Sequence, residues 1–179
     1  MDVSQLSIIL IGYRGTGKST IARLLAERLG YDWIDADDEI EQRAGKSIAA
    51  IFAEDGEAAF RELEADVVAE ICQLRKTVIA LGGGAVMSEV NRTAIRLAGI
   101  VIWLKASVET IANRMAADET TASRRPNLTA SGGLSEIDSV LATREPIYRG
   151  CATFEVDTEG RTPTDVVDEV VRLLDRHNN

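Results

Sequence analysis

The sequence predicts a single α/β domain, residues 1–179, with a three-layer α-β-α P-loop fold around a five-stranded parallel sheet. Two observations predict it. Short apolar runs alternate with helical patterns along the chain, and the first run leads into a glycine-rich phosphate loop. The length suffices for one substantial core and leaves no room for a second full domain.

The phosphate loop is the motif Gly12-Tyr13-Arg14-Gly15-Thr16-Gly17-Lys18-Ser19. The apolar strand pattern at residues 7–11 precedes it, and a helical pattern ending at Gly30 follows it. The spacing G-x-x-x-x-G-K-S places glycines where the backbone must approach phosphate oxygens, with the positive end of a helix dipole beside them. Lys18 then supplies a mobile cation, and Ser19 a hydroxyl for Mg²⁺.

The middle of the chain continues the alternation. Residues 31–35 predict a second strand that ends in Asp35, followed by short helices over 37–44 and from 48 to 52, the latter capped by Ser47. Residues 57–74 predict the clearest long helix, whose apolar face consists of Phe60, Leu63, Val67, Ile71 and Leu74. The apolar run 77–81 predicts a third strand, buried on both faces, that leads into Gly82-Gly83-Gly84.

The C-terminal part predicts two more strands, at residues 100–104 and 153–157. Ser88, Ser107 and Ser135 open helices between them, and Pro146 predicts a kink in the last of these. The final helix has Thr162 as its cap and Pro163 at its first position. Residues 116–133 show no periodicity, which indicates a functional lid or a disordered loop.

Composition excludes several classes of function. The net charge of −9 argues against nucleic acid or an anionic membrane as a partner, and no apolar run could span a bilayer. The first residues lack an export signal, so we expect a cytoplasmic protein. The only cysteines, Cys72 and Cys151, do not form a C-x-x-C pair, and we expect both to be small apolar fillers in a reducing compartment.

Carboxylates and arginines are the remaining candidates for chemistry. Asp35 lies where a strand of a parallel sheet ends and could serve Mg²⁺, while Asp37 could accept a proton; the alternative is that both merely cap the next helix. The triple glycine favours close approach of the backbone to a ligand, or else a tight turn. The arginines Arg61, Arg125 and Arg144 could converge on the same site, although a lone arginine is usually a solvated surface residue.

In order and spacing, these motifs resemble the shikimate kinase family over nearly the whole chain. The resemblance rests on the loop G-x-x-G-x-G-K-S-T, Asp35-Ala36-Asp37, Phe60-Arg61-x-x-Glu64, the triple glycine followed by Ala85-Val86, Arg125-Pro126, and Arg144-Glu145-Pro146-Ile147-Tyr148. It implies transfer of a phosphoryl group from ATP to the 3-hydroxyl of shikimate. It also implies the strand order 2-3-1-4-5, as in nucleoside monophosphate kinases.

The resemblance assigns roles by position. On the nucleotide side, Lys18 would contact the phosphates, Ser19 and Asp35 would serve Mg²⁺, and the other contacts would be Gly15, Thr16, Gly17, Thr20, Arg114 and Pro163. On the acceptor side, Asp37 would bind ring hydroxyls and act as the base, and Arg61 and Arg144 would pair with the shikimate carboxylate. Gly82, Gly83 and Gly84 would pack against the ring, and Arg125 would neutralise the transferring phosphate.

The resemblance also divides the domain into a substrate-binding region, residues about 36–65, and a lid, residues about 116–133. The long lid leaves open whether Arg124 or Arg125 enters the site. We expect a monomer. The alternatives are a gluconate kinase, in which a histidine is expected early in the chain, a nucleoside monophosphate kinase, and a regulatory member that has lost catalysis. The sequence has no histidine before His177, which argues against a gluconate kinase. It retains Lys18, Asp35, Asp37, Arg61 and Arg144, which argues against the loss of catalysis.

Overall fold

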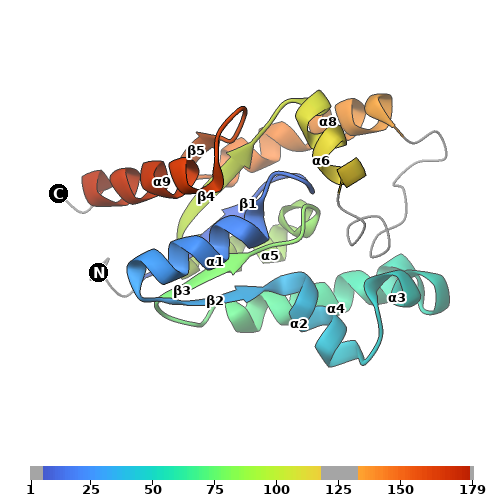
Figure 1. The fold of residues 1–179 in the computed structure, drawn as a ribbon. Helices are drawn as coiled ribbons and strands as arrows, with labels where there is room; N and C mark the ends of the chain where they lie inside the picture. Colours follow the sequence, from blue (N-terminus) through green and yellow to red (C-terminus); the bar gives the residue numbers. More distant parts are fainter. Residues whose placement is uncertain (1–5, 118–132, 178–179) are drawn as a thin grey trace.

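A five-stranded parallel sheet in the order β2-β3-β1-β4-β5 lies at the centre of the computed structural model, which describes residues 6–117 and 133–177 (Figure 1). This confirms the predicted fold class and strand order. Each predicted strand is present within one or two residues of its predicted ends. The strands are β1 (Ser7–Ile11), β2 (Asp32–Asp35), β3 (Thr77–Ala80), β4 (Gly99–Lys105) and β5 (Phe154–Asp157).

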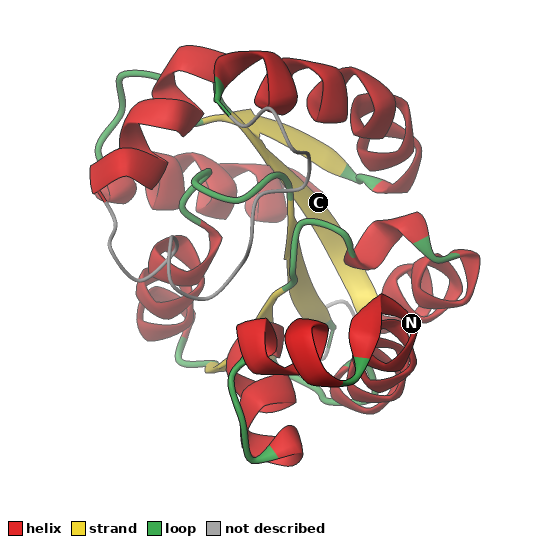
Figure 2. Ribbon diagram, turned by 90° about the vertical axis from the view of Figure 1, so that its right-hand side faces the viewer, coloured by secondary structure: helices red, strands yellow, loops and turns green. Residues whose placement is uncertain are grey.

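Helices cover both faces of this sheet (Figure 2). Helices α1 and α9 pack on one face and α4, α5 and α8 on the other, with α2 and α3 beside α4. The helices are α1 (Lys18–Leu29), α2 (Ala36–Ala44), α3 (Ile48–Glu54), α4 (Gly56–Ile71), α5 (Glu89–Ala98), α6 (Val108–Ala117), α8 (Leu134–Cys151) and α9 (Pro163–His177), with the 3₁₀ turn η2 (Ala85–Met87).

The central strand β1 shows why both layers are needed. Ile8 and Leu10 contact the α1 and α9 layer, whereas Ile9 and Ile11 contact the opposite layer. All four side chains are at most 3% exposed. Since successive residues of a strand point to opposite faces, an apolar run buried along its whole length requires helices on both sides.

Most helix ends follow the local signals, but Ser135 does not cap α8, which begins at Leu134 after Gly133 without a side-chain cap. Ser47 and Ser88 accept the backbone N–H groups of Ala50 and Asn91 and so cap α3 and α5. Helix α4 ends at Ile71, however, and Leu74 is 41% exposed instead of completing the apolar face. Helix α8 continues through Pro146 as one helix, where the sequence predicted a kink.

The cysteines are in the apolar interior, as predicted. Cys72 and Cys151 are both free and buried, and both belong to the core on the α4 and α8 side of the sheet. Burial, with a smaller contribution from Cys151, raises the pKa of the Cys72 thiol to about 12, which keeps it protonated at neutral pH. Within the described ranges, no helix combines the length and the apolar character needed to span a bilayer.

Candidate active site

The phosphate loop connects β1 to α1 and is fixed by close backbone contacts. A Cβ atom on Gly12, whose φ is +138°, would lie 2.4 Å from the carbonyl oxygen of Leu104. A Cβ atom on Gly15, with φ +76°, would lie 3.2 Å from the carbonyl oxygen of Ile111. Only glycine fits these positions, because the loop passes between the end of β4 and helix α6.

The interior of this loop carries the polar groups that the motif requires. Lys18 Nζ donates to the carbonyl oxygens of Gly12 and Tyr13, at 2.9 and 2.8 Å, and Thr16 Oγ1 donates to the latter at 2.7 Å. Helix α1 begins directly after Gly17, without a side-chain cap and without an acidic residue in its first turn. Its N-terminus therefore keeps the positive field that attracts phosphate.

The two residues predicted to bind metal are in direct contact. Ser19 Oγ donates to Asp35 Oδ2 at 2.5 Å, and Asp35 Oδ1 accepts the backbone N–H of Asp37 at 2.9 Å. Asp35 is thus the N-cap of α2, which confirms the capping alternative, and it also contacts the loop hydroxyl, so its predicted role at a metal stays a prediction. Burial, followed by the charge of Asp37, raises the pKa of Asp35.

The Ser19 hydroxyl and the Asp35 carboxylate are of the kind that can hold a magnesium ion. A hydroxyl and a carboxylate oxygen are hard ligands of the kind Mg²⁺ prefers. In the described part of the chain there is no cluster of three or more His, Cys, Asp or Glu side chains that could form an all-protein metal cage. A pair of oxygen ligands beside a phosphate loop is the arrangement in which Mg²⁺ keeps several waters and binds phosphate oxygens.

Both predicted carboxylate-binding arginines meet at the triple glycine that follows β3. Arg144, from α8, donates through Nη1 to the carbonyl oxygen of Gly83 at 3.2 Å. A Cβ atom on Gly84 would lie 2.9 Å from Nη1 of Arg61, from α4. One on Gly83 would lie 3.3 Å from the carbonyl oxygen of Gly12. The glycines therefore let the two guanidinium groups and the phosphate loop approach one strand end.

Carboxylates on α4 orient Arg61. Its Nη1 donates to Glu64 at 2.7 Å and its Nη2 to Glu57 at 3.2 Å. The side chain of Glu64 is 2% exposed, whereas that of Arg61 is 34% exposed. A buried carboxylate thus holds one edge of the planar guanidinium, and the exposed remainder can face a ligand.

A second part of the site lies on the other side of the loop, where α6, β5 and α9 meet. The predicted adenine-side residues Arg114 and Pro163 line a cavity of about 260 Å³ together with Thr16, Gly17 and Thr20. Arg114 donates through Nη1 to Thr158 Oγ1 at 2.9 Å and through Nη2 to the Thr158 carbonyl oxygen at 2.8 Å.

Comparison with known proteins agrees with this geometry. The family model described as shikimate kinase matches residues 14–175. This chain belongs to the shikimate kinase family. A shikimate kinase of Rhodopirellula baltica is 43% identical over 171 residues, which cover 96% of this chain and 91% of the relative. The solved structure of a shikimate kinase from Acinetobacter baumannii in complex with shikimate has a TM-score of 0.91 and 32% identity, covering 98% of this chain and 96% of that one.

The gluconate kinase alternative is more distant than the shikimate kinase family. A solved gluconokinase from Sinorhizobium meliloti has a TM-score of 0.61 and 20% identity, and covers 96% of this chain and 93% of that one. A likeness at this level shows a shared fold and nothing more. The comparisons therefore favour the shikimate kinase family over the gluconate kinases.

Not every predicted residue can be placed, and some residues at the site were not predicted. Arg124, Arg125 and most of the predicted lid of this shikimate kinase family member, residues 118–132, lie outside the described residues. Thr158 and Arg161 line the nucleotide-side cavity without having been predicted. The one signal for them in the sequence is their position directly after β5. Ligands bind beyond the carboxyl ends of parallel strands, so residues at such a strand end are candidates for a binding site.

In the sequence, Tyr148 stands out only as the last residue of the motif Arg144-Glu145-Pro146-Ile147-Tyr148. Its hydroxyl donates to the carbonyl oxygen of Gly83 at 2.5 Å, and its side chain is fully buried. It therefore shares with Arg144 the task of fixing the middle glycine in this shikimate kinase family member. Nothing in the sequence pattern distinguishes a buried tyrosine that packs from one that also binds a backbone carbonyl.

Proposed function

We propose that this chain is a shikimate kinase that transfers the γ-phosphoryl group of ATP to the 3-hydroxyl of shikimate, giving shikimate 3-phosphate and ADP for chorismate and aromatic amino-acid biosynthesis. The observation that carries the proposal is the meeting of a complete phosphate loop with Arg61 and Arg144 at the triple glycine. A phosphate cradle beside two planar cations suits an acceptor that carries a carboxylate.

On the donor side, we assign the ATP phosphates to Lys18 and to residues Gly15 to Thr20, and the adenine to Arg114 and Pro163. The contact between Ser19 and Asp35 supports a site for Mg²⁺ there. When bound, the ion would neutralise charge on the phosphate oxygens. Lys18 already lies inside the loop, so a small movement of its Nζ away from the Gly12 carbonyl would bring it to a phosphate.

On the acceptor side, we assign proton abstraction to Asp37 in the first turn of α2, next to Asp35. Its carboxylate would accept the proton of the 3-hydroxyl as the oxygen attacks the γ-phosphorus. Arg61 and Arg144 would bind the shikimate carboxylate, and Gly82 to Gly84 would pack against the ring. Together they would orient the acceptor for in-line attack.

The residues outside the described ranges enter the proposal through the sequence alone. We assign charge neutralisation on the transferring phosphate to Arg125. Residues about 116–133 would form a lid on ATP, and residues about 36–65 would close on shikimate, which would exclude water. We further propose that the protein is a monomer and acts in the cytoplasm, where ATP is available.

The test is ADP formation by the purified protein from MgATP with shikimate, gluconate or no acceptor. We expect turnover with shikimate only. Turnover with gluconate would overturn the acceptor assignment, and no turnover with any acceptor would favour a regulatory role.

The Asp37→Asn variant tests the assigned base. We expect kcat to fall by a factor of about 100 or more, because the attacking hydroxyl loses its proton acceptor, while the KM for ATP changes little. The matched control is Asp38→Asn, which removes an exposed carboxylate from the same helical turn and should leave turnover near normal. Near-normal turnover by Asp37→Asn would exclude it as the base.

A further inference from the structure

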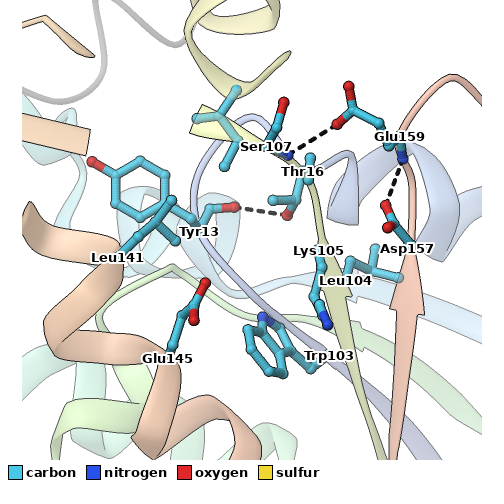
Figure 3. A pocket seen from close by; sticks show the side chains of 12 residues that line it. Tyr13, Thr16, Trp103, Leu104, Lys105, Ser107, Leu141, Glu145, Asp157 and Glu159 are labelled. Atoms are coloured by element: carbon cyan, nitrogen blue, oxygen red, sulfur yellow. Dashed lines mark hydrogen bonds between the residues drawn. The ribbon is translucent and has the colours of Figure 1, made fainter. Parts of the chain in front are cut away.

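A second cavity, of about 300 Å³, lies behind the phosphate loop, between the carboxyl ends of β4 and β5 and helices α6 and α8 (Figure 3). Its lining includes none of the proposed catalytic or acceptor-binding residues, and it shares only Thr16 with the nucleotide-side cavity. Ligand cavities in proteins begin at about this volume. It is therefore large enough for a single small molecule and is separate from the proposed acceptor site.

Trp103, at the floor of this cavity, carries an unused donor. Its side chain is only 2% exposed, and no group in the described part of the chain accepts a hydrogen bond from its Nε1. The ring stacks on Tyr148, with centroids 5.7 Å apart, and has Lys105 Nζ at 5.1 Å from its centroid. Figure 3 shows its nitrogen on the edge that faces the cavity. This nitrogen is not among the fully buried polar atoms without a partner, so the cavity reaches it and a ligand acceptor there can take its N–H.

The charged groups around the cavity are mostly acidic. Three carboxylates line it, those of Glu145, Asp157 and Glu159, against the single ammonium of Lys105. That ammonium is already paired with Glu155 at 3.0 Å, outside the cavity. The lining therefore has an excess of negative charge, which favours a positively charged occupant.

The carboxylates differ in how far they are already satisfied. Glu159 accepts the Ser107 N–H at 2.9 Å and the Thr110 hydroxyl at 2.5 Å, and these hydrogen bonds lower its pKa. Glu145 is half-buried on α8, points into the cavity in Figure 3, and pairs with no described cation. Glu145 is thus the carboxylate with the most to gain from a ligand cation.

We propose that this cavity binds a small amphipathic amine that also carries one hydrogen-bond acceptor, such as an amino amide or amino alcohol. Its ammonium group pairs with Glu145, and its acceptor takes the Trp103 indole N–H. Its apolar part packs on Leu104, Ile111 and Leu141, which complete the lining. Such an occupant contacts the phosphate loop from behind, at Tyr13 and Thr16.

The probe for this proposal is L-leucinamide, with N-acetyl-L-leucinamide as the control that lacks the ammonium group. Trp33 and Trp103 are the only tryptophans, so the Trp33→Phe variant makes Trp103 the sole indole reporter. We expect saturable quenching of its fluorescence by leucinamide and none by the acetylated control. Equal responses to both, or no response to either, would overturn the proposal and leave a merely hydrated cavity.

Variants then locate the binding, which calorimetry can follow in the otherwise unmodified chain. Glu145→Gln is expected to weaken leucinamide about tenfold, the effect of losing one charge-assisted contact. Asp138→Asn removes an exposed carboxylate from the same helix and should change nothing. Unchanged affinity in Glu145→Gln, or a loss in Asp37→Asn, would place the amine elsewhere and refute the assignment.

Discussion

The Tyr148→Phe variant removes one oxygen atom from the buried wall behind the triple glycine. The lost hydroxyl donates to the Gly83 carbonyl oxygen at 2.5 Å, and that carbonyl also accepts from Arg144 Nη1 at 3.2 Å. The aromatic ring, which stacks on Trp103, is retained. The substitution therefore tests one hydrogen bond without opening a cavity larger than the hydroxyl.

The magnitude follows from the two donors. A buried hydrogen bond contributes about 1 kcal/mol net, and a buried acceptor left with no partner costs roughly 1–3 kcal/mol. Since Arg144 continues to donate to Gly83, the loss should stay near about 1 kcal/mol. This corresponds to a fall in Tm of about 2–4 °C for a chain of this size. In the Tyr148→Phe/Arg144→Ala double variant, the carbonyl loses both donors, so the total loss should exceed the sum of the single losses.

Urea unfolding measures this loss, and steady-state kinetics measures its effect on function. If Gly83 belongs to the acceptor site, kcat/KM for shikimate should fall roughly tenfold while the KM for ATP stays within about twofold. The matched control is Tyr13→Phe, judged by stability alone. Tyr13 is 1% exposed, and its hydroxyl has no partner among the described residues, so its removal should be neutral or stabilising. Equal destabilisation by the two substitutions would refute the assigned hydrogen bond.

Three further substitutions test the proposed roles. Lys18→Met should reduce ADP formation at least about 100-fold and leave the protein folded, with a small loss of stability from the two lost hydrogen bonds to the loop; normal turnover would exclude Lys18 from catalysis. Arg61→Lys keeps a cation beside buried Glu64 but loses the planar fork, so the KM for shikimate should rise roughly tenfold with the KM for ATP unchanged; equal weakening of both would contradict the assignment. For Asp35, the pKa is raised by burial and then by Asp37, so the native state binds a proton more readily than the unfolded chain. Stability of the nucleotide-free protein therefore falls as pH rises above the ordinary value of 3.8 towards the raised value. Asp35→Asn keeps a capping oxygen, so at pH 7 it should be more stable to urea than the parent. It should also need more Mg²⁺ for turnover. A variant less stable than the parent would show that burial of the Asp35 carboxylate does not lower the free energy of unfolding.

Much of the fold could be predicted because its signals are local. The apolar runs gave all five strands, and side chains such as Ser47 and Ser88 gave helix starts, because a cap depends only on residues three positions away. The failure at Leu74 is of a different kind. Its spacing continues the apolar face of α4, but the helix ends at Ile71, and helix ends depend on where the next strand must begin.

The site was predictable in parts. The phosphate loop determines its own shape, and Asp35 follows from its place at a strand end. The pairing of Arg61 and Arg144 with a substrate carboxylate could be proposed only through resemblance, since a lone arginine carries no signal of its partner. Thr158 and Arg161 were missed because neither stands in a pattern that indicates a nucleotide.

By itself, the sequence determined the phosphate loop, the alternation of strands and helices, and the family. These are readable in the sequence because the steric limits on glycine and the hydrogen bonds within a short segment act over a few residues. Only the tertiary structure decided that Arg61, Arg144 and Tyr148 meet at Gly83 and Gly84, and that the indole edge of Trp103 faces a cavity. These contacts join α4, α8, β3 and β4, which are distant in the chain, and they exist because burial of apolar faces on one sheet brings those elements together.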